Sequence, residues 1–411
     1  MRVLVTDGDN RGTLAVTRSL GRSGHDVIVG DTHRRALAQA SRYCRERVVY
    51  PDPVTNSDRF VETVAEIVQT RRVDVLMPVA DITTFLVAAH RGRFACQVPL
   101  PALSTIERAA NKVEIMQCAK RLGVPVPRGV TVNDANALDA LHVDFPVVVK
   151  PWRSRVHANG RWHALSVSFA NSRDELLSDL RARPSFAFPI LLQERIEGPG
   201  VGVFACFDQG RPVALFSHRR LRERPPWGGV SVLCESVELD PKAQAYAVLL
   251  LENIGWQGPA MVEFKVDSRN GAPTLMEING RFWGSLQLAI DAGVDFPMLA
   301  IRTLDHGPFA PQPGYRVGIR SRWLWGDLDS LMLSLRRSTR ALLPASAPGR
   351  LASIRDFGRL WGHDLHYDNP KWDDPWPWVV ETGARLSGIP RGLASLASAA
   401  GHKERGNQVV S

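Results

Sequence analysis

The sequence predicts a mixed α/β and α+β fold, on the basis of two patterns in different parts of the chain. In the first hundred residues, short apolar runs alternate with helix-like segments, which is the rhythm of βαβ units around a parallel sheet. Near residue 270, two β-like runs, 260–266 and 274–280, flank a turn-rich stretch containing Asn-Gly, which is typical of an antiparallel hairpin. With 411 residues, the chain is long enough for two or three domains.

The N-terminal part is predicted to form a Rossmann-like domain. Its strand-like and helix-like segments alternate: 3–5, 13–22, 25–30, 60–69 and 73–78. Asp31 directly follows the second strand, as the ribose-binding acid of a dinucleotide site does. The glycines, however, are spaced as Gly8-x-x-x-Gly12 and lack the G-x-G-x-x-G pattern that permits close approach to a pyrophosphate. An NAD(P)-dependent oxidoreductase is therefore kept only as an alternative.

From Ser104 onwards the pattern changes. Residues 105–122 have helical periodicity up to Gly123, and Asp240-Pro241 begins a helix that runs to Asn253. The other predicted elements are strands, the last two of which flank a turn: 145–151, 191–196, 201–207 and 212–216. Beyond about residue 311 the sequence is rich in Arg and Trp without a catalytic pattern. It ends in a polar tail after Ala400 that we expect to be disordered.

Bulk composition bears on the class of protein and its partners. The chain is 44% hydrophobic and 23% charged, as ordinary globular proteins are, and no apolar run reaches the ~18 residues of a transmembrane helix. The formal net charge of +9 comes from dispersed arginines, so we expect no nucleic-acid partner. Five cysteines without a C-x-x-C pair, and a first strand without a signal-peptide pattern, favour a cytoplasmic protein with reduced thiols.

The predicted hairpin near residue 270 places acidic side chains together. If Asp267 pairs with Pro273, Glu263 lies directly opposite Glu277, and Asn279 points to the same face. Opposed carboxylates repel, and a divalent cation between them would remove that repulsion. Two carboxylates and an amide oxygen suit Mg²⁺ (or Mn²⁺) bound together with a nucleotide. The alternative, two solvated carboxylates on an exposed face, fits poorly with the apolar neighbours in both runs.

These residues belong to an ordered set that resembles the ATP-grasp superfamily, which includes biotin carboxylase, carbamoyl phosphate synthetase and D-alanine–D-alanine ligase. The resemblance covers roughly residues 105–300, and residues 276–281 (Met-Glu-Ile-Asn-Gly-Arg) are its strongest motif. The first hundred residues look like the domain that precedes the ATP-grasp domain in these enzymes. Residues 212–223 and 282–284 are also similar to a bacterial subgroup of predicted ATP-dependent carboligases.

The resemblance implies a domain division and a nucleotide site. It places a pre-ATP-grasp domain at 1–103 and the ATP-grasp domain at 104–310, with a nucleotide-covering part (104–190) and a metal-binding part (191–310). Residues 311–411 form a C-terminal extension of unknown function. The implied nucleotide-binding residues are two phosphate-side lysines, one loop serine and three residues of the strand that holds adenine: Lys112, Lys150, Ser154, Gln193, Glu194 and Ile196. The implied metal ligands are Glu263, Glu277 and Asn279.

Three arginines are the candidate catalytic residues. Arg281 would share the face of the metal ligands and stabilise charge on a transferring phosphoryl group, although an ion pair with Glu277 is an alternative. Arg219 and Arg220, which follow His218, would clamp a substrate carboxylate, although a solvated basic face is also plausible. Each lysine, in turn, could be an exposed residue without a ligand.

Two features depart from the family pattern. The loop at 152–160, usually glycine-rich, has a single glycine, so phosphate covering would depend on Ser154, Arg155 and backbone amides. Val201 stands where an acidic residue often holds the ribose. Both departures keep a non-catalytic nucleotide-binding protein as a further alternative.

The resemblance therefore implies an ATP-dependent, ADP-forming carboxylate–amine ligase. It would use ATP and Mg²⁺ (or Mn²⁺) to form an acyl phosphate from a small carboxylate, which a small amine then attacks. A homodimer is possible. The sequence leaves open which acid and amine react, the oligomeric state and the role of residues 311–411.

Overall fold

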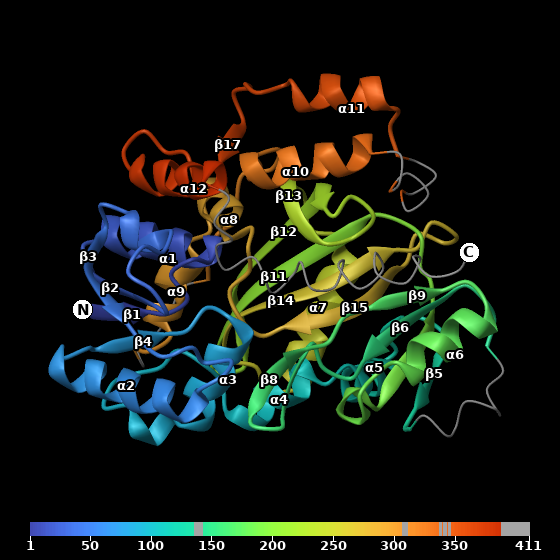
Figure 1. Cartoon of the computed structure of the whole chain (residues 1–411), viewed down its shortest axis with the longest axis horizontal. Helices are drawn as coiled ribbons and strands as arrows, with labels where there is room; N and C mark the ends of the chain where they lie inside the picture. The colour runs from blue at the N-terminus through green and yellow to red at the C-terminus, as the bar shows by residue number, and fades with distance from the viewer. Residues whose placement is uncertain (135–142, 306–310, 337–338, 340–342, 344–346, 388–411) are drawn as a thin grey trace, which may run out of the picture.

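The computed structural model describes residues 1–134, 143–305, 311–336, 339, 343 and 347–387, and the tail after Ala400 that we expect to be disordered lies outside them. Figure 1 shows a parallel N-terminal sheet at one side, a large sheet in the centre and a smaller sheet on the far side, with the C-terminal helices along the upper edge. The architecture is mixed α/β, as the sequence predicts.

The N-terminal sheet has four parallel strands in the order β3-β2-β1-β4. Its elements, in chain order, are β1 (Arg2–Val5), α1 (Arg11–Arg22), β2 (Asp26–Asp31), β3 (Cys44–Val49), α2 (Ser57–Thr70), β4 (Val75–Met77) and α3 (Asp81–Ala89). Because side chains alternate along a strand, Val3 and Val5 pack with α1, whereas Leu4 packs with α2 and α3. The sequence does not predict β3, because three charged residues of this edge strand, Arg45, Glu46 and Arg47, hide its strand character.

The smaller sheet is antiparallel, with the order β5-β10-β6-β9. This part contains α4 (Leu103–Ala110), α5 (Lys112–Arg121), β5 (Gly129–Val132), β6 (Val147–Pro151), β9 (Ser168–Ala170), α6 (Arg173–Arg181) and β10 (Ile190–Glu194). The single helix predicted over 105–122 is wrong. Asn111 leaves helical geometry (φ −83°, ψ 98°), and its side chain accepts a hydrogen bond from the Glu114 N–H, which starts α5 as a separate helix.

The central sheet has seven strands in the order β15-β14-β11-β12-β13-β16-β17. It and its covering helices comprise β11 (Gly200–Asp208), β12 (Arg211–Arg224), β13 (Val230–Ser236), α7 (Pro241–Asn253), β14 (Gly258–Val266), β15 (Pro273–Asn279), α8 (Leu286–Ala292), α9 (Phe296–Arg302), β16 (Arg320–Arg322) and β17 (Leu365–Tyr367). On one face Phe264 packs with α7, and on the other Phe204 packs with α8, α9 and the N-terminal helix α1. The sheet therefore carries a core on each side.

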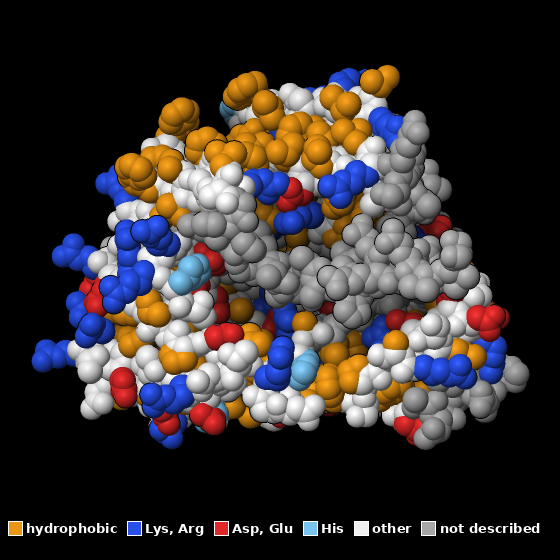
Figure 2. Space-filling view, viewed as in Figure 1, with side chains coloured by type: hydrophobic (Ala, Val, Ile, Leu, Met, Phe, Trp, Pro, Cys, Tyr) orange, Lys and Arg blue, Asp and Glu red, His pale blue; other side chains and the backbone are white. Residues whose placement is uncertain are grey.

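The segment after residue 311 is tied into this sheet. β16 pairs with β13, and β17 pairs with β16. Between these two strands the chain forms α10 (Leu324–Leu335) and α11 (Arg350–Phe357), and after β17 it forms α12 (Trp376–Leu386). Figure 2 shows hydrophobic side chains gathered over these helices, and Leu351 and Trp372 are among the most exposed. Among the described residues, no helix is long and apolar enough to cross a membrane.

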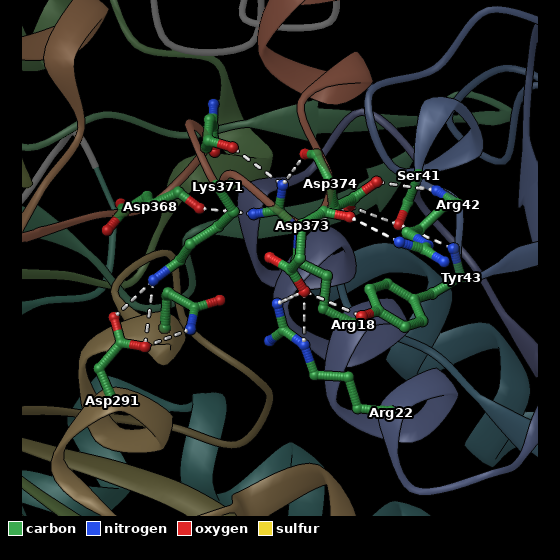
Figure 3. Close-up of polar contacts among 12 residues, drawn as sticks. Arg18, Arg22, Ser41, Arg42, Tyr43, Asp291, Asp368, Lys371, Asp373 and Asp374 are labelled. Atoms are coloured by element: carbon green, nitrogen blue, oxygen red, sulfur yellow. Dashed lines mark hydrogen bonds and ion pairs between the residues drawn. The ribbon is translucent and has the colours of Figure 1, made fainter.

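A buried ion pair fastens the C-terminal segment to the N-terminal sheet. Arg18 of α1 and Asp374 have side chains with 0% exposure and a separation of 2.8 Å between Nε and Oδ2. Arg18 also donates to the carbonyls of Asp368, Asn369 and Asp374, and Asp374 accepts from Ser41 Oγ, as Figure 3 shows. Because every charged group is paired and hydrogen-bonded, the cost of burying the two charges is offset. We call residues 368–374 the C-terminal clasp.

The clasp yields a stability prediction. Arg18→Met leaves the Asp374 carboxylate buried without its partner, so we expect the free energy of unfolding to fall by about 3–5 kcal/mol. Arg22→Met is the matched control. Its ion pair with Asp373 spans 2.7 Å but is 36% and 45% exposed, so its loss should cost about 1 kcal/mol or less. Urea unfolding measures both, and equal losses in the two variants would contradict a special role for the buried pair.

Candidate active site

The hairpin of β14 and β15 brings the two predicted metal-binding glutamates face to face. Glu263 lies directly opposite Glu277. The pairing assumed for the loop is wrong, because Val266, and not Asp267, is the partner of Pro273. A register shift between Glu263 and Phe264 adds one residue to β15 and restores the opposition of the two carboxylates. A β-bulge therefore produces the arrangement that the sequence predicts from an unbroken ladder.

Each carboxylate has a cationic partner from another part of the chain. Arg220 of β12 donates to Glu263 Oε2 at 2.7 Å, and Lys112 Nζ lies 3.1 Å from Glu277 Oε2. The Asn279 amide donates to Glu277 Oε1 at 3.1 Å. Cations of the protein thus already reduce the repulsion between the two glutamates. A metal ion is therefore not required to explain why the two carboxylates lie together.

The electrostatics of the pair are asymmetric. Burial alone would raise the pKa of Glu277, but Lys112, Asn279 and Lys150 lower it to about 2. Burial and the neighbouring Glu277 raise the pKa of Glu263, against the opposing effect of Arg220. Asn279 donates through its amide nitrogen, which leaves its oxygen for another partner. Two carboxylates and an amide oxygen on one face are the donor set that Mg²⁺ prefers, so these residues fit the predicted metal.

The two predicted phosphate-side lysines lie beside this pair. Lys112 starts α5, is 8% exposed, and also donates to Ser154 Oγ at 2.9 Å, so it connects the loop after β6 to the hairpin. Lys150 is the penultimate residue of β6 and is partly buried, and its Nζ contacts Met276 Sδ at 3.9 Å. Burial lowers the pKa of Lys150 to about 8, although Glu277 acts in the opposite direction. The structure therefore brings Lys112, Lys150, Ser154 and the glutamates together.

The strand predicted to hold adenine borders the same cavity. Gln193 is buried on β10, and Ile196 is buried just beyond it with its carbonyl accepting from Lys265 Nζ at 3.1 Å. Glu194 accepts from Arg128 and Arg269, which lower its pKa to about 2 against the effect of burial. A cavity of about 1910 Å³ is lined by Lys150, Glu194, Ile196, Glu263 and Glu277, whereas Lys112, Ser154 and Gln193 are not among its lining residues.

The three predicted catalytic arginines do not lie together in the structure. Adjacent residues of a strand face opposite sides, so Arg220 reaches Glu263 while Arg219 pairs with Glu235, which also binds Arg320. Arg281 lies 2.5 Å from Asp81 of the N-terminal α3.

His218 is not a cleft residue, although the sequence groups it with the two arginines. It is 1% exposed and stacks on Phe204 at 4.6 Å. Burial and Arg220 lower its pKa to about 3, so it is neutral at physiological pH.

The loop after β6 is ordered by a hairpin that the sequence does not predict. β7 (Arg155–Ala158) and β8 (Arg161–Ala164) meet at Asn159 and Gly160, which have φ of 51° and 75°. Asn-Gly with positive φ at both positions is the strongest short hairpin signal, so the sequence does contain the information. Trp162 of β8 docks on the N-terminal part, donating from its backbone N–H to Val54 O at 2.9 Å and packing edge-on against Phe85.

The dinucleotide alternative finds little support in the N-terminal sheet. A Cβ on Gly8 would lie 2.8 Å from Ala36 Cβ, so this glycine serves close packing. Asp31 accepts from the Asp9 and Thr32 N–H groups and contacts His33 at 2.6 Å. The acid expected to bind a ribose is thus engaged within its own loop.

Comparisons with known proteins agree with the predicted family. Residues 187–325 match a family model described as ATP-grasp in the biosynthetic pathway with Ter operon. No curated protein sequence matches the chain.

Several solved structures have the same fold. A biotin carboxylase–βγ-ATP complex from Campylobacter jejuni is 17% identical, with a TM-score of 0.62 over 77% of this chain and 74% of that one. The L-amino acid ligase from Bacillus licheniformis is 16% identical, with a TM-score of 0.57 over 75% of each chain. The biotin carboxylase domain of the Hydrogenobacter thermophilus 2-oxoglutarate carboxylase, in complex with MgADP, ADP and bicarbonate, is 17% identical, with a TM-score of 0.60 over 78% and 73%. At these identities the likeness establishes the fold, and the predicted ATP-grasp enzyme class agrees with the enzymes named.

The lowered pKa of Lys150 predicts a pH dependence of nucleotide binding. Phosphate favours the ammonium form, so binding above about pH 8 requires proton uptake, and the Kd for Mg-ATP should rise up to about tenfold per pH unit there. Lys150→Met should bind more weakly at pH 7 and lose this dependence between pH 7 and 9. Isothermal titration calorimetry measures both, and the same slope in the two proteins would assign the dependence to another group.

Proposed function

We propose that the chain is an ATP-dependent, ADP-forming carboxylate–amine ligase, because residues 187–325 match an ATP-grasp family model. The observation that supports this proposal best is the opposed pair of Glu263 and Glu277, which both line the cavity, with Lys112 paired to Glu277. A carboxylate oxygen of the substrate would attack the γ-phosphorus of ATP, and ADP would leave. An amine would then attack the acyl phosphate, losing a proton and releasing phosphate to form an amide.

The residues of the cleft would act mainly by positioning and by charge. Glu263, Glu277 and Asn279 would hold Mg²⁺ (or Mn²⁺), which supplies positive charge to the phosphates when bound. Lys112 and Lys150 would contact the phosphates as compact ammonium groups. Gln193, Glu194 and Ile196 would border the adenine, with Ser154 covering the phosphate end through its contact with Lys112.

The parts of the chain would divide this work. Residues 1–103 would serve as the Rossmann-like pre-ATP-grasp domain, and residues 104–310 as the ATP-grasp domain with its two parts. Arg220, which reaches Glu263, would act in the cleft, whereas Arg219 would act only through its contact with Glu235. The small-molecule acid and amine, the homodimer, the absence of a nucleic-acid partner and the cytoplasmic location stay predictions.

Nucleotide binding at the proposed site can be tested by thermal shift. Mg-ATP at about 100 times its Kd adds about 2.7 kcal/mol of stability, which raises the melting temperature by several degrees. Glu277→Gln should lose this shift because it removes one negative ligand and the partner of Lys112. Glu252→Gln, the same chemical change at an exposed position of α7, should keep it. A full shift in Glu277→Gln would place the nucleotide elsewhere.

Ligase activity needs a separate assay. ADP release should require both an acid and an amine from a panel of small compounds, and Glu277→Gln should reduce it by at least about a hundredfold. Nicotinamide cofactor binding without any response to Mg-ATP would instead favour the oxidoreductase. Mg-ATP binding without ADP release from any pair would favour a non-catalytic nucleotide-binding protein.

A further inference from the structure

The C-terminal segment exposes large apolar side chains on its outer surface. Leu351 and Trp361 are 84% and 86% exposed, and Trp372 and Leu386 are 104% and 79% exposed. They lie in or beside α11 and α12, along the upper edge of the molecule in Figure 1, and Figure 2 shows hydrophobic side chains gathered there. Large exposed apolar patches mark sites of interaction with a protein, a ligand or a membrane. The C-terminal apolar face consists of Leu351, Ile354, Trp361, Trp372, Trp376, Val379 and Leu386.

The two helices turn an apolar stripe outward. In α12, Trp376, Val379 and Leu386 are exposed and are spaced three and seven residues apart, which places them on one side of the helix. Pro377 and Ala384, on the other side, are buried. A surface helix of an ordinary globular protein has the opposite arrangement, with polar residues outward. The pattern of α12 therefore provides for a second apolar contact beyond the one within the fold.

The apolar face stands on a fixed support. Asp327 of α10 and Arg322 of β16 form an ion pair of 2.7 Å in which both side chains are 1% exposed. Arg322 also donates to the carbonyl of Phe357 in α11 at 2.9 Å, and its guanidinium lies over the Phe357 ring. The clasp holds the chain before α12 through Arg18 and Asp374. The outward direction of the apolar side chains is thus a property of the fold.

Positive charge accompanies the apolar side chains along α11. Residues 350–361 contain three arginines and one aspartate. The Arg355 side chain is 72% exposed, and its contact with Asp356 is 3.5 Å long. Asp364, which is also exposed, contacts His363. The acidic residues of α10 and of the clasp are engaged in ion pairs with arginines: Asp327, Asp329, Asp373 and Asp374. The face therefore combines apolar anchors with an excess of positive charge on α11.

We propose that the C-terminal apolar face is a docking surface for a membrane that contains anionic lipids. The Trp and Leu side chains would enter the boundary between the headgroups and the acyl chains, where Trp is favoured. Arg350, Arg355 and Arg359 would contact the lipid phosphates, with their aliphatic stems along the apolar layer. The formal net charge of +9 attracts the chain to an anionic surface in the same way.

The form of the face favours a lipid surface over a protein partner. Its side chains project singly into solvent, and a fluid bilayer accommodates such anchors without a matching surface. A stable protein interface needs shape complementarity close to that of a protein interior. Trp361 belongs both to this face and to the lining of the large cavity, so one end of the cavity would lie beside the membrane.

Binding of the full chain to vesicles tests this proposal. The protein is mixed with vesicles of phosphatidylcholine alone or with about 30% phosphatidylglycerol, and the bound fraction is measured by flotation. Binding to the anionic vesicles should be at least about tenfold tighter and should weaken at high salt. Trp372→Ser and Leu351→Ser should each weaken it about tenfold, because each removes an apolar side chain that the membrane buries. Arg355→Gln should weaken it about fivefold.

Leu249→Ser is the matched control for Leu351→Ser. Leu249 is 37% exposed on α7, outside the C-terminal apolar face, so its loss should leave vesicle binding unchanged. The melting temperatures of all variants should stay within about 2 °C of the wild type, since surface substitutions change stability little. Phospholipids with brominated acyl chains should quench the Trp emission of the wild type more than that of Trp372→Ser.

The remaining outcomes would overturn the proposal. They are the absence of vesicle binding and equal binding by the wild type and Trp372→Ser. Equal binding to neutral and anionic vesicles would remove the role of the arginines and with it the anionic lipid. Size-exclusion chromatography with light scattering tests for a second copy of the chain. A dimer that Trp372→Ser abolishes, in a protein that does not bind vesicles, would assign the face to self-association.

Discussion

The opposed carboxylates of Glu263 and Glu277 determine the electrostatics of the cleft. They lie on neighbouring strands, and their negative charges are compensated by Arg220 from β12 and Lys112 from α5. The need to balance these two charges therefore links the β14–β15 hairpin to β12 and to α5. Arg220 also pairs with Glu223, so together with Lys150 the group has three negative and three positive charges. A free divalent cation gains little from such a site, whereas a metal–nucleotide complex brings its own negative charge. A metal site at this position, as proposed, would therefore favour Mg-ATP over the bare metal.

The N-terminal sheet and its helices are held by contacts on two sides. On the cleft side, Asp81 binds Arg281 and the α2–α3 surface holds Trp162. On the far side, the C-terminal clasp fixes α1 through the buried pair of Arg18 and Asp374. A sheet held at both sides is a stable support for the residues that contact it, Arg281 and Trp162, which matters because catalysis by positioning depends on small displacements. The clasp thus contributes to the site although it lies away from it.

The sequence predicts the locally encoded elements well and the long-range ones poorly. The hairpin of β14–β15 and helix α7 follow from turn residues, alternation and the cap Asp240, whose side chain accepts from the Ala243 N–H. The break at Asn111 is a local cap that helical periodicity conceals. The bulge beside Glu263, the opposite faces of Arg219 and Arg220, and the Arg281–Asp81 contact depend on strand register and on residues far apart in the chain. Periodicity alone carries no information about these contacts.

The C-terminal segment shows why the substrates are harder to infer than the nucleotide. It has no catalytic motif, yet Arg320, Trp361 and Leu365 line the same cavity as Lys150 and Glu277. At about 1910 Å³, this cavity exceeds the roughly 300–1,000 Å³ of a typical small-molecule site, so it has room for a nucleotide and a second ligand. The end proposed to bind the nucleotide is built from short motifs within continuous strands. The other end is built where β16 and β17 join the sheet by long-range pairing, so its shape is a property of the folded chain and not of any single stretch of sequence.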